Sequence, residues 1–228
     1  NGVKTLNEKA NSLWGRASMA LQYALLRSGP MSMAPSQMGC FTKSDDFQHT
    51  PNLEYHVQPL STESLGDSLH SFPAITMSVC NLRPQSRGSI HLRDNNFINA
   101  PLINPNYLNE VQDKLVAAQG IRITRRICSQ PALEQYAPVE LKPGPELISD
   151  DQLSLAAGDI GTTIFHPVGT CKMGNDQFSV VDEQLRVRGA KKLRVVDASI
   201  MPTITSGNTN SPVIMIAEKA SDMILSDY

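Results

Sequence analysis

The chain alternates between two hydrophobic periods, one typical of helices and one typical of strands. Near its start, Leu13, Ala17 and Leu21 lie one helical turn apart, and Gly29 and Pro30 follow as a signal that ends a helix. Similar spacing recurs further along the chain, in windows long enough for helices. The pattern predicts helices over residues 6–27, 107–127, 131–136, 149–157 and 213–225.

A period of two marks the strand candidates. Leu53, Tyr55 and Val57 alternate with polar neighbours, which is typical of a strand that is buried on one face. Residues 74–82 and 89–93 are two further candidates, and the three together favour an antiparallel sheet. The predicted fold class is α+β, with helices, an antiparallel sheet and a strand-turn-helix near the C-terminus.

Residues 31–40 show neither period. They are rich in Met, Ser and Pro, so the sequence predicts a loop there. Because thioethers adapt to irregular shapes, Met31, Met33 and Met38 suit two roles: they could fill gaps in the core, or line a pocket for an apolar substrate. The sequence leaves both roles open.

Composition and charge narrow the class of protein. A chain of 228 residues with 40% hydrophobic residues can bury a sizeable core in one or two domains. The net charge of −2 gives no reason to expect a nucleic acid or an anionic membrane as partner. No stretch approaches the roughly 20 apolar residues of a spanning helix. The 4 cysteines form no Cys-x-x-Cys pair. We expect reduced thiols and a cytoplasmic protein that is at most membrane-peripheral.

The candidate chemistry lies near the C-terminus. The segment His166–Gly174 sets one imidazole among Gly and Pro turn residues. Residues 193–199 predict a short buried strand that ends in Asp197, and residues 202–212 predict a polar turn. With an ordinary pKa of about 6.5, a histidine is the natural proton acceptor near neutral pH. A lone histidine before a turn is by itself weak evidence for catalysis.

The predicted last helix adds a second feature. Ser211 suits the N-cap position and Pro212 the first helical position. The helix start then presents unpaired amides and a partial positive charge of roughly half a unit. Such a helix end favours an anionic group.

Several of these segments occur in the order of one known family. They resemble the C-terminal part of the glucose-methanol-choline (GMC) family of flavin oxidoreductases, in particular its choline-dehydrogenase-like alcohol dehydrogenases. The resemblance is carried by His166–Gly174, Leu193–Ser199, Pro202–Pro212, Arg83–Ile90 and Asn104–Leu108.

The resemblance also sets expectations for the domains. The family binds FAD through a Gly-x-Gly-x-x-Gly turn near its N-terminus, and this chain contains no such turn. We therefore expect most of the FAD site in a preceding part of the same protein, which would be this chain's main partner. Residues 1–160 would form the substrate-binding domain, in which the resemblance implies that the helices cover the antiparallel sheet, and residues 161–228 would return to the FAD-binding domain with the active-site motifs.

The resemblance implies roles for individual residues in the oxidation of an alcohol. His166 would be the base and Asn208 the hydrogen-bonding partner at the substrate oxygen. Asp197 and Ala198 would lie near the phosphate and ribityl chain of FAD, and Thr209 and Asn210 at the flavin edge that becomes anionic. The substrate would be a small-molecule alcohol, and the electron acceptor stays unidentified.

Other interpretations remain open. A flavin-containing hydroxynitrile lyase uses the same fold, and the chain could also be a non-catalytic interaction module. For residues 207–210 the plain alternative is a capped turn, and for Asp197 a local cap. Arg83 and Arg87 are expected to fix a hairpin. The other four histidines, His49, His56, His70 and His91, are expected to be structural or surface residues, and the five show no metal-ligand spacing.

Overall fold

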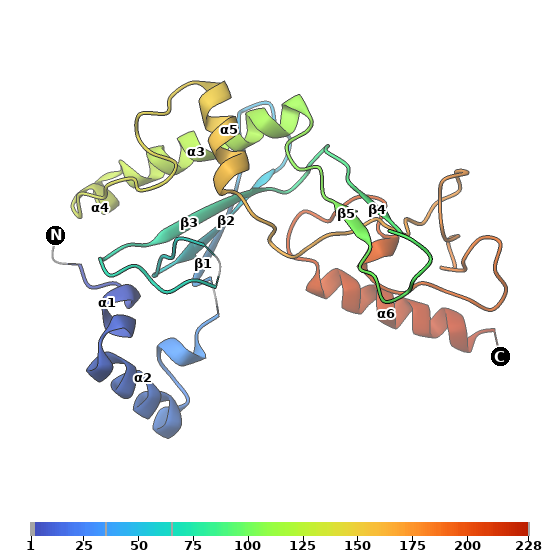
Figure 1. The fold of residues 1–228 in the computed structure, drawn as a ribbon, viewed down its shortest axis with the longest axis horizontal. Coiled ribbons are helices and arrows are strands. Elements are labelled where there is room, and N and C mark those ends of the chain that lie inside the picture. Colours follow the sequence, from blue (N-terminus) through green and yellow to red (C-terminus); the bar gives the residue numbers. More distant parts are fainter. Residues whose placement is uncertain (1–2, 35, 65, 228) are drawn as a thin grey trace. The chain divides into compact units, whose positions relative to one another are not determined.

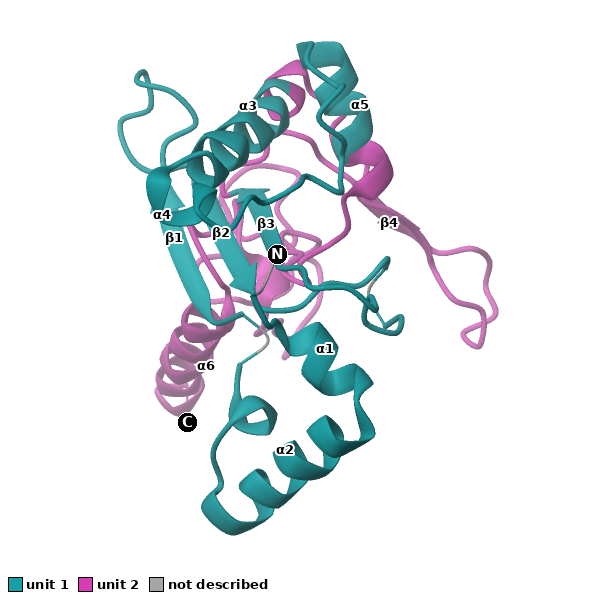
Figure 2. Ribbon diagram, turned by 90° about the vertical axis from the view of Figure 1, so that its left-hand side faces the viewer, with its two compact units in different colours: residues 1–81, 115–157 teal, residues 82–114, 158–228 magenta. Residues whose placement is uncertain are grey.

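The computed structural model describes residues 3–34, 36–64 and 66–227. The chain forms two compact units, residues 1–81 with 115–157 and residues 82–114 with 158–228 (Figure 2). The helices are α1 Leu6–Asn11, α2 Leu13–Leu26, α3 Val111–Cys128, α4 Pro131–Glu134, α5 Asp150–Ile160 and α6 Asn210–Leu225, with short 3-10 turns η1 Pro30–Ser32 and η2 Ala198–Ile200. The strands are β1 Met38–Thr42, β2 Leu53–Gln58, β3 Thr76–Asn81, β4 Ser89–His91 and β5 Leu102–Asn104.

The first unit is built on a three-stranded antiparallel sheet in the order β1-β2-β3 (Figure 1). Leu53 and Tyr55 of β2 are buried with Val116 and Ile123 of α3. The Tyr55 hydroxyl donates to the carbonyl of Gly120 at 3.0 Å, which ties the helix to the sheet. The predicted α+β class, an antiparallel sheet with a helix on one face, is confirmed.

Two predictions for this unit are corrected. The helix expected over residues 6–27 is two helices, because Ser12 is extended (φ −95°, ψ 133°) and its hydroxyl accepts from the amide of Gly15. The loop expected over residues 31–40 ends early, since β1 begins at Met38 and pairs Met38 with Val57. Residue 35 of that expected loop lies outside the described residues.

Helix α3 begins four residues later than expected. Asn106 and Leu108 both adopt positive φ angles (53° and 54°), which a right-handed helix excludes, so the helix starts at Val111. Strands β3 and β4 and helices α4 and α5 lie within a few residues of their predicted ranges. Within the described residues, no helix is both long and apolar enough to cross a membrane.

The second unit has little regular sheet. Strands β4 and β5 form a hairpin that pairs Ile90 with Ile103. Next to it Gly88 lies so close to the other strand that a β-carbon there would meet the carbonyl oxygen of Asn104 at 2.2 Å. The Arg87 carbonyl accepts from Nδ2 of Asn106 at 3.0 Å, a contact across this hairpin.

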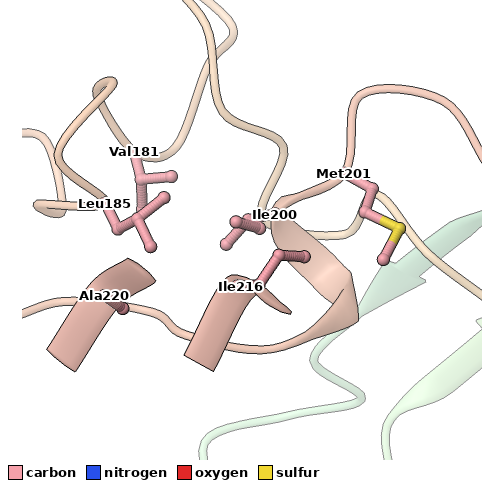
Figure 3. Close-up of a cluster of buried hydrophobic side chains, with 6 residues drawn as sticks. All are labelled: Val181, Leu185, Ile200, Met201, Ile216 and Ala220. Atoms are coloured by element: carbon pink, nitrogen blue, oxygen red, sulfur yellow. The ribbon is translucent and has the colours of Figure 1, made fainter. Parts of the chain in front are cut away.

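The core of the second unit gathers around α6 (Figure 3). Ile216 and Ala220 on one face of the helix pack with residues that come from turns and from η2. The buried cluster consists of Val181, Leu185, Ile200, Met201, Ile216 and Ala220. This core carries the segments in which the sequence placed the chemistry.

The strand expected over residues 193–196 is wrong for this structure. Arg194 makes a single antiparallel bridge to Arg186, flanked by one hydrogen bond from Val195 to Leu185 and one from Val187 to Leu193. A strand requires a neighbouring strand with which it forms a ladder, and the described part of the chain supplies only this isolated bridge beside the segment. Val195 and Val196 are still half-buried, because they pack against the α6 cluster, whereas Leu193 is exposed.

Candidate active site

His166 lies in a turn that is held by backbone hydrogen bonds. Phe165 before it and Gly169 after it have positive φ angles (67° and 90°), so the backbone on both sides of the imidazole is irregular. Further along, the amide of Cys171 donates to the carbonyl of Ser199 at 2.9 Å, and the amide of Met173 donates to that of Ile200 at 2.8 Å. The His166 turn is thereby fixed to η2 without belonging to a strand.

Both nitrogens of the His166 ring have a side-chain partner. Nδ1 lies 2.8 Å from the Thr209 hydroxyl oxygen, and Nε2 lies 2.9 Å from Nδ2 of Asn208. An amide nitrogen only donates, so Nε2 accepts and the single ring proton of a neutral imidazole sits on Nδ1, which donates to Thr209. This tautomer leaves the basic lone pair on the nitrogen that faces Asn208.

Thr209 holds the ring from the start of α6. It is 7% exposed and occupies the N-cap position, yet its hydroxyl makes no capping hydrogen bond. The prediction that Ser211 is the N-cap and Pro212 the first helical residue is wrong, because α6 already begins at Asn210. The Thr209 hydroxyl is hydrogen-bonded to His166 and does not cap the helix.

The N-terminus of α6 retains the electrostatic character expected from the sequence. The amide of Val213 makes the first intrahelical bond, to the carbonyl of Thr209 at 3.0 Å. The amides of Asn210 and Ser211 precede this bond, and Pro212 has no N–H. Two peptide donors and the helix dipole therefore face the turn that carries Asn208 and Asn210. This arrangement favours an anionic group.

Asp197 and Ala198 are placed by η2. The Asp197 carboxylate accepts from the amide of Ser199 at 2.7 Å, so it caps this short turn. The side chain is exposed, and Ala198 is half-buried against the α6 cluster. Through the bonds between η2 and the His166 turn, both residues belong to the same framework as the imidazole. Contact with a cofactor stays a prediction for these two residues and for Asn210.

The structure adds one residue that the sequence pattern could not connect to this site. The Arg83 guanidinium donates to the Ser206 hydroxyl through Nε at 3.3 Å and Nη2 at 3.2 Å. Ser206 directly precedes the Gly207-Asn208 turn, and Gly207 has a φ of 154°. The two partners are 123 positions apart, so no local spacing signals this clamp.

The turn with His166, the Asn208 loop and the start of α6 all lie between residues 84 and 217. Residues 84–217 match the family model of the GMC oxidoreductases. The chain belongs to the GMC oxidoreductase family. The family resemblance inferred from the sequence motifs is thus confirmed.

Two curated relatives in the GMC family share most of this chain. It is 41% identical over 203 residues to an alcohol dehydrogenase [acceptor] of Pseudomonas putida, a match that covers 89% of this chain and 37% of the relative. It is 39% identical over 211 residues to an oxygen-dependent choline dehydrogenase of Paraburkholderia phytofirmans, covering 92% and 38%. The chain thus spans less than two fifths of the length of these GMC relatives.

A solved GMC-like structure has the same fold. A variant of Aspergillus oryzae formate oxidase, determined to follow FAD modification, superposes with a TM-score of 0.80 at 25% identity. The match covers 94% of this chain and 42% of that one. The shared region again corresponds to a minor part of a longer flavoprotein.

Proposed function

We propose that this chain is the C-terminal part of an FAD-dependent oxidoreductase that oxidises the CH–OH group of a small alcohol to a carbonyl. Membership of the GMC family and the similarity to an alcohol dehydrogenase support this reaction class. The observation that carries the proposal is the pair His166 Nε2 and Asn208 Nδ2, 2.9 Å apart. It offers one proton acceptor and one hydrogen-bond donor side by side.

Oxidation of an alcohol requires that the hydroxyl proton and a hydride leave the same carbon–oxygen unit. His166 would take the proton at Nε2 once the substrate hydroxyl replaces Asn208 as the donor to that nitrogen, and a positioned base of this kind contributes on the order of a hundred- to ten-thousand-fold. Asn208 Nδ2 donates to the oxygen as it becomes negative. The Nδ1–H to Thr209 bond keeps the ring oriented in both protonation states.

FAD, when bound, supplies the hydride acceptor. In this chain, the amides of Asn210 and Ser211 at the start of α6 would hold its anionic edge, and Asp197 and Ala198 would lie toward its ribityl and phosphate groups. The preceding part of the protein would provide the remaining contacts, since this chain has no Gly-rich dinucleotide turn.

The first test uses the full-length protein under anaerobic conditions, with primary aliphatic alcohols and choline as separate substrates. We expect an alcohol to bleach the flavin, and His166→Gln to slow this step at least about a hundredfold. His49→Gln is the matched control because His49 is exposed and lies in the other unit. Bleaching at an unchanged rate in His166→Gln would refute the role of His166.

The same experiment separates the second enzyme class. A hydroxynitrile lyase acts on a cyanohydrin without net reduction of its flavin, so no alcohol would bleach it. A protein that binds no flavin at all would instead favour the interaction module. Absorption spectra of the chain alone, and of the chain produced together with the preceding part, test where FAD is held. We expect the flavin band only with both parts.

A further inference from the structure

A second cluster of reactive side chains lies in the first unit, on the three-stranded sheet. Cys80 of β3 is the direct cross-strand partner of Glu54 of β2, and His56 follows two residues after Glu54. Side chains of paired residues and of residues two apart point to the same face of a sheet. Leu53 and Tyr55 pack on α3, so the three polar groups share the face opposite the helix.

The three side chains converge. One ligand atom from each of Glu54, His56 and Cys80 can be chosen so that all lie within 4.8 Å of one another. The residue of β1 that pairs with His56 is Gly39, so no side chain occupies the place beside the imidazole on that strand. The sheet backbone holds this arrangement independently of any flexible loop.

Glu54 of this cluster is buried, His56 and Cys80 are half-buried, and two polar atoms of the cluster lack a hydrogen-bond partner among the described residues. Glu54 is 3% exposed, although the alternating pattern predicted an outward polar side chain. Its Oε2 and the Nε2 of His56 are buried atoms without a hydrogen-bond partner among the described residues. The imidazole Nε2 and the carboxylate Oε1 are 3.5 Å apart. A buried polar atom without a partner costs about 1–3 kcal/mol, and more for a charged group. Such a cost points to a missing cationic partner.

We propose that Glu54, His56 and Cys80 bind one zinc ion. A carboxylate oxygen, an imidazole nitrogen and a thiolate sulfur are the three ligand types of protein zinc sites, with bond lengths of roughly 2.0–2.3 Å. Calcium and magnesium prefer oxygen ligands only, so the sulfur selects against them. Three protein ligands leave a fourth tetrahedral position for water or another small ligand.

The ion would satisfy both buried atoms at once. Zinc placed between the strands engages a Glu54 oxygen and His56 Nε2 and replaces the Cys80 thiol proton. A proton shared between Glu54 and His56 is the competing explanation, because a shift of the imidazole would close the 3.5 Å gap. The two explanations differ in whether the protein retains a metal and whether sulfur is bound to it.

The experiment uses the full-length protein, stripped with a chelator, dialysed, and titrated with zinc chloride. We expect one tightly bound zinc per chain by elemental mass spectrometry. Cys80→Ser and Glu54→Gln should each weaken binding at least about tenfold. Cys128→Ser and His49→Gln serve as matched controls, since Cys128 is likewise half-buried in the same unit and neither residue belongs to the cluster.

X-ray absorption at the zinc edge supplies a readout that does not depend on the variants folding. One sulfur at about 2.3 Å and nitrogen or oxygen ligands at about 2.0 Å are expected in the wild-type protein. No retained zinc, zinc without a sulfur ligand, or binding unaltered in Cys80→Ser would overturn the proposal. These measurements require no substrate, so their outcome is independent of the proposed alcohol oxidation.

Discussion

The two units of the chain build their hydrophobic cores from different kinds of element. In the first, regular elements make the core: β2 and α3 bury Leu53, Tyr55 and Val116 against each other. In the second, one helix packs on turns, and the buried Val181, Leu185 and Ile200 come from segments with little regular structure. The unit with the regular core follows the hydrophobic period of its sequence closely. The other depends on particular side-chain bonds.

Side-chain bonds of this kind hold several turns of the second unit. Asp176, Asp182 and Asp197 each accept a backbone amide within their own turn, at 2.7–2.9 Å. Such local caps hold turns that no strand ladder supports. Functional residues are often carried by loops on a fixed scaffold, and here the scaffold is α6 with its buried cluster.

The strongest test of this comparison is to truncate one buried side chain in each core, one variant at a time. Leu53→Ala in the first unit and Ile200→Ala in the second should each lower the free energy of unfolding by about 2–5 kcal/mol, because each deletes a fully buried side chain. Hydrogen exchange should show lost protection in β1–β3 for Leu53→Ala and in residues 166–227 for Ile200→Ala. Equal loosening of both regions by either variant would contradict two separate cores.

A smaller effect is expected at the bond that holds the base. Thr209→Val removes the acceptor of the His166 Nδ1 proton at nearly constant volume, and we expect alcohol-dependent flavin reduction to slow about tenfold with an altered pH profile. Thr209→Ser retains the hydroxyl and should stay close to the wild-type rate. Equal rates for the Val and Ser variants would show that the hydroxyl does not position the ring.

The first unit offers a matched polar contact in its core. Tyr55→Phe removes the hydroxyl that donates to Gly120 and accepts from Thr124, so the free energy of unfolding should fall by about 1 kcal/mol. Tyr136→Phe, at a half-exposed tyrosine, should change it by less than about 0.5 kcal/mol. Urea denaturation measures both. A Tyr55 variant as stable as the wild type would mean that packing alone joins α3 to the sheet.

The smallest effect concerns acid stability of the second unit. Hydrogen bonds from Ser179, Lys172 and the Phe178 amide lower the pKa of Asp176 from its usual 3.8 to about 2. Since the folded pKa is depressed, the stabilisation is fully present above pH 3.8 and is lost as the pH falls through about 2. Hydrogen exchange of residues 172–181 should rise over this window in the wild type. In Asp176→Asn the rise should be absent.

The local sequence pattern predicted much of this structure. The period of two placed β2 and the helical period placed α3, α5 and α6, because burial of one face is a local property of each element. The pattern failed where pairing decided the outcome. Strand β1 forms because its residues pair with β2, beginning with Met38 and Val57. Residues 193–196 form no strand, because among the described residues only one isolated β-bridge pairs them with another segment.

The candidate site likewise has features that the sequence indicated and features that only the structure gives. His166 and Asn208 could be singled out from their motifs. The structure adds that the Asn208 side chain contacts the His166 imidazole. The side-chain role of Thr209 and the Arg83–Ser206 clamp had no signal in the sequence. Both depend on segments brought together over long stretches of chain, and a turn motif carries no information about its distant partner.

By itself the sequence determined the family, the helices and strands with a clear period, and the residues with suitable chemistry, since these follow from side-chain type and local spacing. Only the tertiary structure brought Thr209 and Asn208 to the two ring nitrogens of His166. It alone brought Glu54, His56 and Cys80 together on one face of the sheet. The physical reason is that hydrogen-bond partners and cross-strand neighbours are fixed by register and packing between distant segments.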